Sequence, residues 1–257
     1  MTKKRVLVPI PSNGCDPSEV GIPCKLMMEA GIDIVFATPN GQKATTDTIM
    51  LTGKGLGIWK PVLAARKDAV AAFLEVEKTT AFTNPISYDE IDNQEFDAIY
   101  LPGGHDKPVK EYLESGKLQV SISKFFGDKK PVGAICHGVV LVARSKNPAT
   151  DKSVIHQYKT TSLLNRQELL GFNMTRLWMG DYYLTYPETT VEDEVTAALE
   201  NKDDFIQGPT AILRDSPTKM RRGFFVKDRN YISARWPGDL YSFTAKFIKM
   251  IFDGELF

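Results

Sequence analysis

One short stretch of the chain carries residue types that could do nucleophilic chemistry, namely Cys136, His137 and Gly138. They follow an apolar run over residues 131–135, which is typical of a buried parallel strand, and precede an apolar helical segment over residues 139–143. A strand that turns sharply into a helix resembles a nucleophile elbow. The N-terminus of such a helix favours a thiolate. Cys136 is therefore a candidate nucleophile, the alternative being a small buried apolar side chain.

A catalytic cysteine also needs a base, and the sequence offers three histidines, His105, His137 and His156. His137 is the strongest candidate because it adjoins Cys136, although neighbouring side chains on a turn can diverge. His105 follows a Gly-Gly turn one strand earlier and could line the same pocket. His156 lies in an alternating run, so we interpret it as structural.

Two further features could support that chemistry. The backbone of Gly103 and Gly104 can approach a ligand closely, and its N–H groups could hold a developing negative charge, although the pair also suits an ordinary tight turn. Glu19 lies in the first turn of the first predicted helix, where an acidic residue usually compensates the helix dipole. On sequence alone, compensation of the helix dipole is the favoured interpretation of Glu19.

The elements that must position these residues form an alternating pattern. Four apolar runs are predicted to be strands of one largely parallel sheet: residues 5–10, 32–37, 96–101 and 131–135. A helix capped by Asp16 connects the first two, and a final helix opens after Trp236-Pro237-Gly238-Asp239. Because the turns after parallel strands meet at the carboxyl edge of the sheet, we expect a ligand site there.

The remaining chain departs from this pattern. Shorter β-like runs are predicted at residues 153–159, 182–187 and 210–214, together with a hairpin formed by residues 224–226 and 231–234. Residues 42–93 are interpreted as an insertion that caps one end of the sheet, with a helix from Lys67 to Glu77. The glycines in this insertion are not followed by Lys-Ser or Lys-Thr, so a phosphate loop is not expected. We predict a single domain over residues 1–257.

Composition narrows the classes of function. The chain of 257 residues has 32 basic and 32 acidic side chains, a balance that gives no sign of nucleic-acid or membrane binding. No apolar run is long enough to span a bilayer, and the N-terminal residues lead into a strand rather than a signal-peptide core. Three cysteines, Cys15, Cys24 and Cys136, without metal-ligand spacing predict a reduced cytoplasmic protein.

Several motifs together resemble those of the ThiJ/PfpI superfamily, which includes heat-shock-type glyoxalases and deglycase-like proteins. The motifs are Cys136-His137-Gly138, Leu101-Pro102-Gly103-Gly104-His105, Ala37-Thr38-Pro39-Asn40-Gly41, Glu19 and Trp236-Pro237-Gly238-Asp239. The resemblance implies a three-layer α/β sandwich with a mostly parallel central sheet, of the class I glutamine amidotransferase-like (flavodoxin-like) type. Relative to compact members, residues of about 42–93 and 171–217 form cap insertions.

The resemblance also implies roles for individual residues. Cys136 becomes the nucleophile, Glu19 the carboxyl group that bonds its sulfur, and His137 the general base. The backbone N–H groups of Gly104 and His137 become oxyanion donors. Heat-shock-type members have a third catalytic residue, which is acidic and lies on the loop after the next strand. Glu168 matches it best, with Asn165 and Asp181 as alternatives.

The activity expected from this resemblance is conversion of a 2-oxoaldehyde into a 2-hydroxy acid, a small-molecule reaction that needs no metal or organic cofactor. Two alternatives stay open: hydrolysis through an acyl-cysteine, and a non-enzymatic role as a stress holdase or oxidation sensor. A glutaminase mechanism is not expected because no histidine follows His156. Members of this superfamily often dimerise, so we expect a homodimer.

Overall fold

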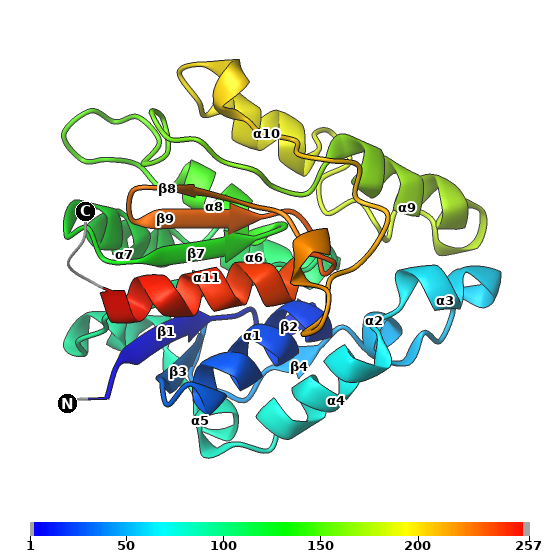
Figure 1. The fold of residues 1–257 in the computed structure, drawn as a ribbon, viewed down its shortest axis with the longest axis horizontal. Helices are drawn as coiled ribbons and strands as arrows, with labels where there is room; N and C mark the ends of the chain where they lie inside the picture. Colours follow the sequence, from blue (N-terminus) through cyan, green and yellow to red (C-terminus); the bar gives the residue numbers. More distant parts are fainter. Residues whose placement is uncertain (1–2, 254–257) are drawn as a thin grey trace.

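The computed structural model describes residues 3–253, and its centre is a seven-stranded sheet with the order β5-β3-β1-β6-β7-β9-β8 (Figure 1). All its strand pairs are parallel except β8 with β9. The strands are β1 Arg5–Pro9, β3 Asp33–Thr38, β5 Ile86–Ser87, β6 Ala98–Leu101, β7 Val132–Ile135, β8 Phe225–Asp228 and β9 Tyr231–Ala234. The predicted domain includes residues 1–2 and 254–257, which lie outside the described range.

Helices cover both faces of this sheet, as predicted for a three-layer α/β sandwich. On one face lie α1 Pro17–Glu29, α4 Lys67–Val76 and α11 Leu240–Asp253, and on the other lie α6 Lys110–Leu113, α7 Gly116–Gly127 and α8 Gly138–Arg144 (Figure 1). Within residues 3–253 no helix combines the length and apolar character that crossing a membrane requires.

The strands alternate their side chains between two apolar cores. Along β1, Leu7 belongs to the core beneath α7 and α8, whereas Val6 and Val8 belong to the core beneath α1 and α11. All three are fully buried, as expected for a central parallel strand with helices on both faces. The four apolar runs predicted as strands of the parallel sheet, over residues 5–10, 32–37, 96–101 and 131–135, are therefore confirmed in position.

Helix α1 begins where the sequence predicted. The Asp16 carboxylate accepts hydrogen bonds from Ser18 N at 2.7 Å and Glu19 N at 3.1 Å, and Pro17 occupies the first turn. Gly31, with φ of 81°, follows the last turn, in a conformation that glycine adopts at little cost. This cap fixes the direction in which the first turn presents Glu19.

The two insertions meet beyond the carboxyl ends of the strands, at the right of Figure 1. Trp178 Nε1 donates a 2.8 Å hydrogen bond to Gly55 O, which joins them directly. The short elements of residues 42–93 include β5, which extends the sheet beside β3. Those not yet given are β4 Thr45–Thr46, which pairs with β2 Asn13–Cys15, and α2 Thr48–Thr52, η1 Gly57–Trp59, α3 Lys60–Leu63, α5 Thr80–Thr83 and η2 Tyr88–Asn93.

The second half of the chain adds a long helix and several short ones before the hairpin. These elements are α9 Asn165–Met179, α10 Val191–Ala197, η4 Lys202–Asp204 and η5 Met220–Arg222. One further short helix, η3 Lys107–Val109, lies earlier in the chain, directly before α6. The predicted hairpin forms as β8 and β9, with Arg229 at a positive φ of 52° in its turn. The final helix buries Leu240, Phe243, Phe247 and Ile251 at the predicted spacing.

Three predictions of β structure were wrong, because residues 153–159, 182–187 and 210–214 form no strand. Their backbone N–H groups bond locally instead: His156 N to Ser153 O at 2.9 Å, Leu184 N to Asp181 O at 2.9 Å and Ile212 N to Thr210 O at 3.1 Å. An alternating sequence makes a strand only when a neighbouring strand supplies partners. These segments lie outside the seven-stranded sheet, and the pairing of Ser153 with Lys146 stays an isolated bridge.

Candidate active site

The sheet topology brings two sharp turns side by side. Strands β6 and β7 are neighbours, with Leu101 opposite Ala134, so the turn after β6 and the elbow after β7 adjoin. Cys136 has a positive φ of 55°, an unusual conformation for a residue with a side chain and the hallmark of a nucleophile elbow. At Gly138 a Cβ atom would lie 2.3 Å from Leu101 O, so only glycine allows the elbow to pack this closely.

Glu19 approaches the elbow from the first turn of α1. Its carboxyl group is buried, accepts a 2.7 Å hydrogen bond from Gly103 N on Oε2 and forms a hydrogen bond with the Cys136 side chain. Asp16 N donates to Gly103 O at 3.1 Å, which ties the start of the helix to the same turn. The favoured sequence interpretation of Glu19 as dipole compensation is therefore incomplete, because its carboxyl group faces the cysteine.

The electrostatics of this pair differ from the prediction of a thiolate favoured by the helix N-terminus. Burial raises the pKa of the Cys136 thiol well above its usual range, the Glu19 and Asp16 carboxyls add to this, and the hydrogen bond from His137 N–H opposes it. Burial also raises the pKa of Glu19 well above its usual range. Desolvation thus outweighs the helix N-terminus, which keeps the Cys136 thiol protonated at neutral pH and favours the neutral form of the Glu19 carboxyl.

His137 lies entirely inside the protein, between the cysteine and a hydroxyl group. Its Nδ1 is 3.4 Å from Cys136 Sγ, and its Nε2 is 3.0 Å from Thr185 Oγ1. Burial lowers the pKa of His137 to about 3, and the neighbouring His105 acts in the same direction. The imidazole is therefore neutral at pH 7 and has one unprotonated ring nitrogen available as a base.

The structure also distinguishes the three candidates for the additional acid. Glu168 is buried in the first turn of α9, with Oε1 4.0 Å from His137 Nε2 and Oε2 accepting a 2.9 Å bond from Val191 N. Burial raises the pKa of Glu168 to about 7. Asn165 is instead engaged by Thr190 and Asp193, and Asp181 forms an exposed ion pair with Lys107. Of the three, Glu168 is the one that faces His137.

The two glycines of the turn after β6 have different surroundings. Gly103 N–H is already used by Glu19, so it is not a free oxyanion donor, and a Cβ at Gly103 would lie 2.8 Å from Glu19 Oε2 and from His137 N. Gly104 has a φ of 151°, and a Cβ there would lie 2.7 Å from Gly14 O. The turn therefore requires glycine at both positions, and its first residue acts by holding the Glu19 carboxyl.

His105 lies beside this turn in an aromatic setting supplied by the insertions. Its ring stacks on Tyr183 at 4.5 Å between centroids and meets Tyr182 edge-on at 4.7 Å. Its Nε2, which is buried and has no hydrogen-bond partner among residues 3–253, is 3.9 Å from Asp47 Oδ2, the oxygen that also accepts from Tyr182 OH. His105 thus lies near His137, whose pKa it helps to lower, and its place in the pocket of Cys136 stays a prediction.

Sequence reasoning missed the residues that the insertions contribute here: Asp47, Tyr182, Tyr183 and Thr185. Asp47 does carry a local signal, because it caps α2 by accepting from Ile49 N and Met50 N. Nothing in the periodicity of either insertion indicates that Asp47 and Tyr182, far apart in the sequence, form a hydrogen bond beside His105. These contacts depend on how the two insertions fold against each other.

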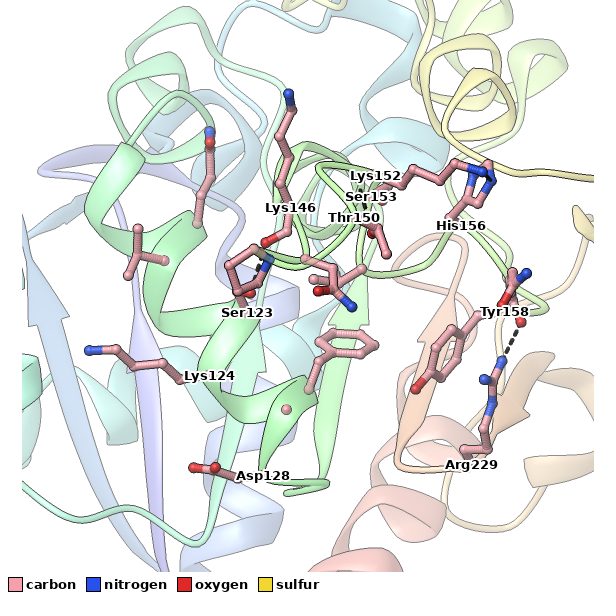
Figure 2. A pocket seen from close by; sticks show the side chains of 18 of the residues that line it. Ser123, Lys124, Asp128, Lys146, Thr150, Lys152, Ser153, His156, Tyr158 and Arg229 are labelled. Atoms are coloured by element: carbon pink, nitrogen blue, oxygen red, sulfur yellow. Dashed lines mark hydrogen bonds between the residues drawn. The ribbon is translucent and has the colours of Figure 1, made fainter.

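A broad surface cavity of about 1220 Å³ lies elsewhere, between α7, the loop over residues 146–158 and Arg229 (Figure 2). Its basic side chains have partners of their own: Lys146 pairs with Asp151, Lys124 with Asp92, Arg229 with Asp228, and Lys152 Nζ with His156 Nε2 at 2.9 Å. His156 Nδ1 lies 3.1 Å from Ala198 O. His156 therefore makes its side-chain hydrogen bonds with Lys152 and Ala198, which agrees with its interpretation as structural.

Comparison with known proteins gives the family. The model described as ThiJ/PfpI family-like matches residues 10–209, which is most of the chain, and the protein therefore belongs to the ThiJ/PfpI family. A deglycase of Thermococcus kodakarensis is 26% identical over 167 residues, covering 65% of this chain and 69% of that protein. The glutathione-independent glyoxalase hsp3102 of Schizosaccharomyces pombe is 24% identical over 153 residues, covering 59% and 60%.

Solved structures agree on the fold. Glyoxalase III of Candida albicans superposes with a TM-score of 0.64 at 17% identity, covering 97% of this chain and 96% of that one. The Francisella tularensis Rapid Encystment Protein superposes with a TM-score of 0.70 at 17% identity, covering 96% and 99%. The mostly parallel sandwich predicted from the sequence is thus the fold of this family.

Proposed function

We propose that this protein is a cysteine-dependent, cofactor-independent enzyme of the glyoxalase or deglycase type, which converts a 2-oxoaldehyde into a 2-hydroxy acid. The observation that carries the proposal is the placement of Cys136, at a positive φ, between the Glu19 carboxyl and a neutral His137 whose Nδ1 is 3.4 Å from the sulfur. The names of the Thermococcus and Schizosaccharomyces relatives support this class of chemistry.

The first step is addition of sulfur to the aldehyde carbon. His137 Nδ1 takes the thiol proton, the S–C bond forms, and the carbonyl π electrons move to oxygen, which takes a proton from Glu19 or from the His137 imidazolium to give a hemithioacetal. Burial raises the pKa of Glu19 and so favours its protonated form, which can donate a hydrogen bond to the sulfur or to the developing alkoxide. The pair therefore provides a base and an acid at one carbonyl.

The second step moves a hydrogen within the bound substrate. The group that gave its proton to the alkoxide, His137 or Glu19, is now unprotonated and removes the proton from the former aldehyde carbon, while the keto oxygen is protonated to give an enediol. The same group then returns the proton to the neighbouring carbon, and the hydroxyl on the sulfur-bearing carbon loses its proton to become a carbonyl. The product is a thioester of the 2-hydroxy acid on Cys136. Water then cleaves the S–C bond, which returns the thiol and releases the acid, so the net reaction consumes one oxoaldehyde and one water.

The test is turnover of methylglyoxal by the purified protein and by Cys136→Ser, with formation of the hydroxy acid followed directly. We expect hydroxy-acid formation by the wild type and a loss on the order of 10³-fold in the variant, because the serine hydroxyl is a far weaker nucleophile. Equal and negligible rates for the two proteins would remove the proposal. Circular dichroism of both proteins shows whether the fold is retained.

We further propose that the protein is a homodimer in a reducing, cytoplasmic environment. Support for the environment comes from Cys15, Cys24 and Cys136, which are all unpaired in the described part of the chain. Light scattering coupled to gel filtration measures the molar mass in solution. A mass equal to that of one chain at micromolar concentration would exclude the dimer.

A further inference from the structure

Thr185 occupies an unexpected position for a residue of the second insertion. It lies in the turn-rich segment after α9, and its side chain is fully buried beside His137. Its Oγ1 is within hydrogen-bond distance of two groups, His105 O at 2.7 Å and His137 Nε2 at 3.0 Å. One hydroxyl group thus links the histidine that follows Cys136 to the loop that follows β6.

Counting protons assigns a direction to both bonds. A carbonyl oxygen can only accept, so the single hydroxyl proton of Thr185 is donated to His105 O. The oxygen of Thr185 is then left as an acceptor toward His137 Nε2, and that nitrogen must carry a proton. Because burial keeps the imidazole neutral, the other nitrogen, Nδ1, carries none.

The unprotonated Nδ1 faces the cysteine. It lies 3.4 Å from Cys136 Sγ, in position to accept the thiol proton. In the opposite tautomer the Nε2 lone pair would face a Thr185 oxygen whose proton is already committed, and one buried polar contact would be lost. In its ionised form the Glu168 carboxyl, with Oε1 4.0 Å from Nε2, also favours a proton on that nitrogen.

We propose that Thr185 is a positioning residue, which fixes His137 in the Nε2–H tautomer and so leaves Nδ1 free to act as the base for Cys136. This inference rests on the proposed function only for its catalytic consequence, because the tautomer is a property of the free protein. In the proton transfer the S–H bond breaks and an Nδ1–H bond forms. The resulting imidazolium keeps its Nε2–H on Thr185, near the Glu168 carboxyl.

The experiment combines a spectroscopic and a chemical readout. Long-range ¹H–¹⁵N spectra report the tautomer of each imidazole, and the chain has only three histidines to assign. We expect the Nε2–H tautomer of His137 in the wild type and in Thr185→Ser, which retains the hydroxyl, and a mixture of tautomers in the isosteric Thr185→Val. The rate at which iodoacetamide alkylates Cys136 should fall on the order of 10-fold in Thr185→Val and be restored in Thr185→Ser.

Two results would overturn the proposal. One is an Nδ1–H tautomer of His137 in the wild type, which needs no variant and so does not depend on whether Thr185→Val folds. The other is a folded Thr185→Val with the wild-type tautomer and alkylation rate. A wild type with the Nε2–H tautomer but no methylglyoxal turnover would instead count against the proposed function alone.

Discussion

Two buried thiols at the same edge of the sheet, Cys136 and Cys15, differ in what surrounds them. Burial raises the pKa of both, to about 12 for Cys15, and the Asp16 carboxyl adds to the effect in each case. Cys15 Sγ lies 4.0 Å from Thr45 O and forms a hydrogen bond with Thr46. Cys136 instead has His137 Nδ1 at 3.4 Å and the Glu19 carboxyl.

The comparison shows that desolvation alone does not distinguish a reactive cysteine from an inert one in this protein. Both thiols are neutral at rest, so the difference lies in where the proton can go. Cys15 has a carbonyl oxygen and a hydroxyl group nearby, which cannot accept its proton at pH 7. Cys136 has the neutral imidazole of His137 beside it and lies on a turn with a positive φ. Cys136 is also 7% exposed, whereas Cys15 is 0% exposed.

The largest effect expected from this contrast is in chemical labelling. Iodoacetamide should alkylate Cys136 in the native protein faster than Cys15 or Cys24, by on the order of 10³-fold, because the latter two require local unfolding before a reagent can reach them. Peptide mass spectrometry over a time course measures the three rates. In denaturant all three should react alike, and comparable native rates for Cys15 and Cys136 would refute the contrast.

The next largest effect concerns Glu168, whose carboxyl group lies 4.0 Å from His137 Nε2. The pKa of Glu168 is raised by burial to about 7 in the folded protein, so the unfolded chain ionises first as the pH rises. The stabilisation that protonated Glu168 provides is complete below its ordinary pKa of 4.5 and is lost as the pH rises through about 7. The contribution of His137 to stability has the opposite pH dependence, because its pKa is lowered to about 3. That contribution is complete above pH 6.5 and is lost as the pH falls through about 3.

Glu168→Gln separates these two contributions. Glutamine can still accept from Val191 N but cannot ionise, so the variant should gain stability relative to the wild type between about pH 4 and about pH 8, by roughly 3 kcal/mol. Urea unfolding of both proteins at each pH gives the free energies of unfolding. Parallel pH profiles would mean that Glu168 ionises as freely in the folded protein as in the unfolded chain.

Much of the fold could be predicted because its signals are local. The apolar runs that become β1, β3, β6 and β7 are continuous, as burial on both faces requires. The run over residues 153–159 misled because its apolar members do reach the core, Val154 and Ile155 both being buried. The alternating sequence pattern was interpreted as a strand, whereas the backbone there closes local turns that bury two consecutive residues.

The site could be predicted only in part, for the same reason. Cys136 and His137 adjoin in the sequence, and the resemblance supplied Glu19 and Glu168, so the structure brings together four residues that were named in advance. Thr185 lay in a segment predicted to be β-like, and nothing local indicates its bonds to His105 and His137. The direction of the Cys136 pKa shift was also missed, since desolvation depends on packing that a sequence does not display.

The smallest effect tests the feature that Cys15 lacks, the carboxyl group of Glu19. Glu19→Ala leaves Gly103 N–H buried without its acceptor, which should cost about 1–3 kcal/mol in the free energy of unfolding. Glu19→Gln keeps an oxygen for Gly103 and an amide that can donate to the Cys136 sulfur, so it should cost less than about 1 kcal/mol. Urea unfolding at neutral pH compares the two. Equal losses would show that the ionisable carboxyl, and not its hydrogen bond to Gly103, is what holds the turn against the elbow.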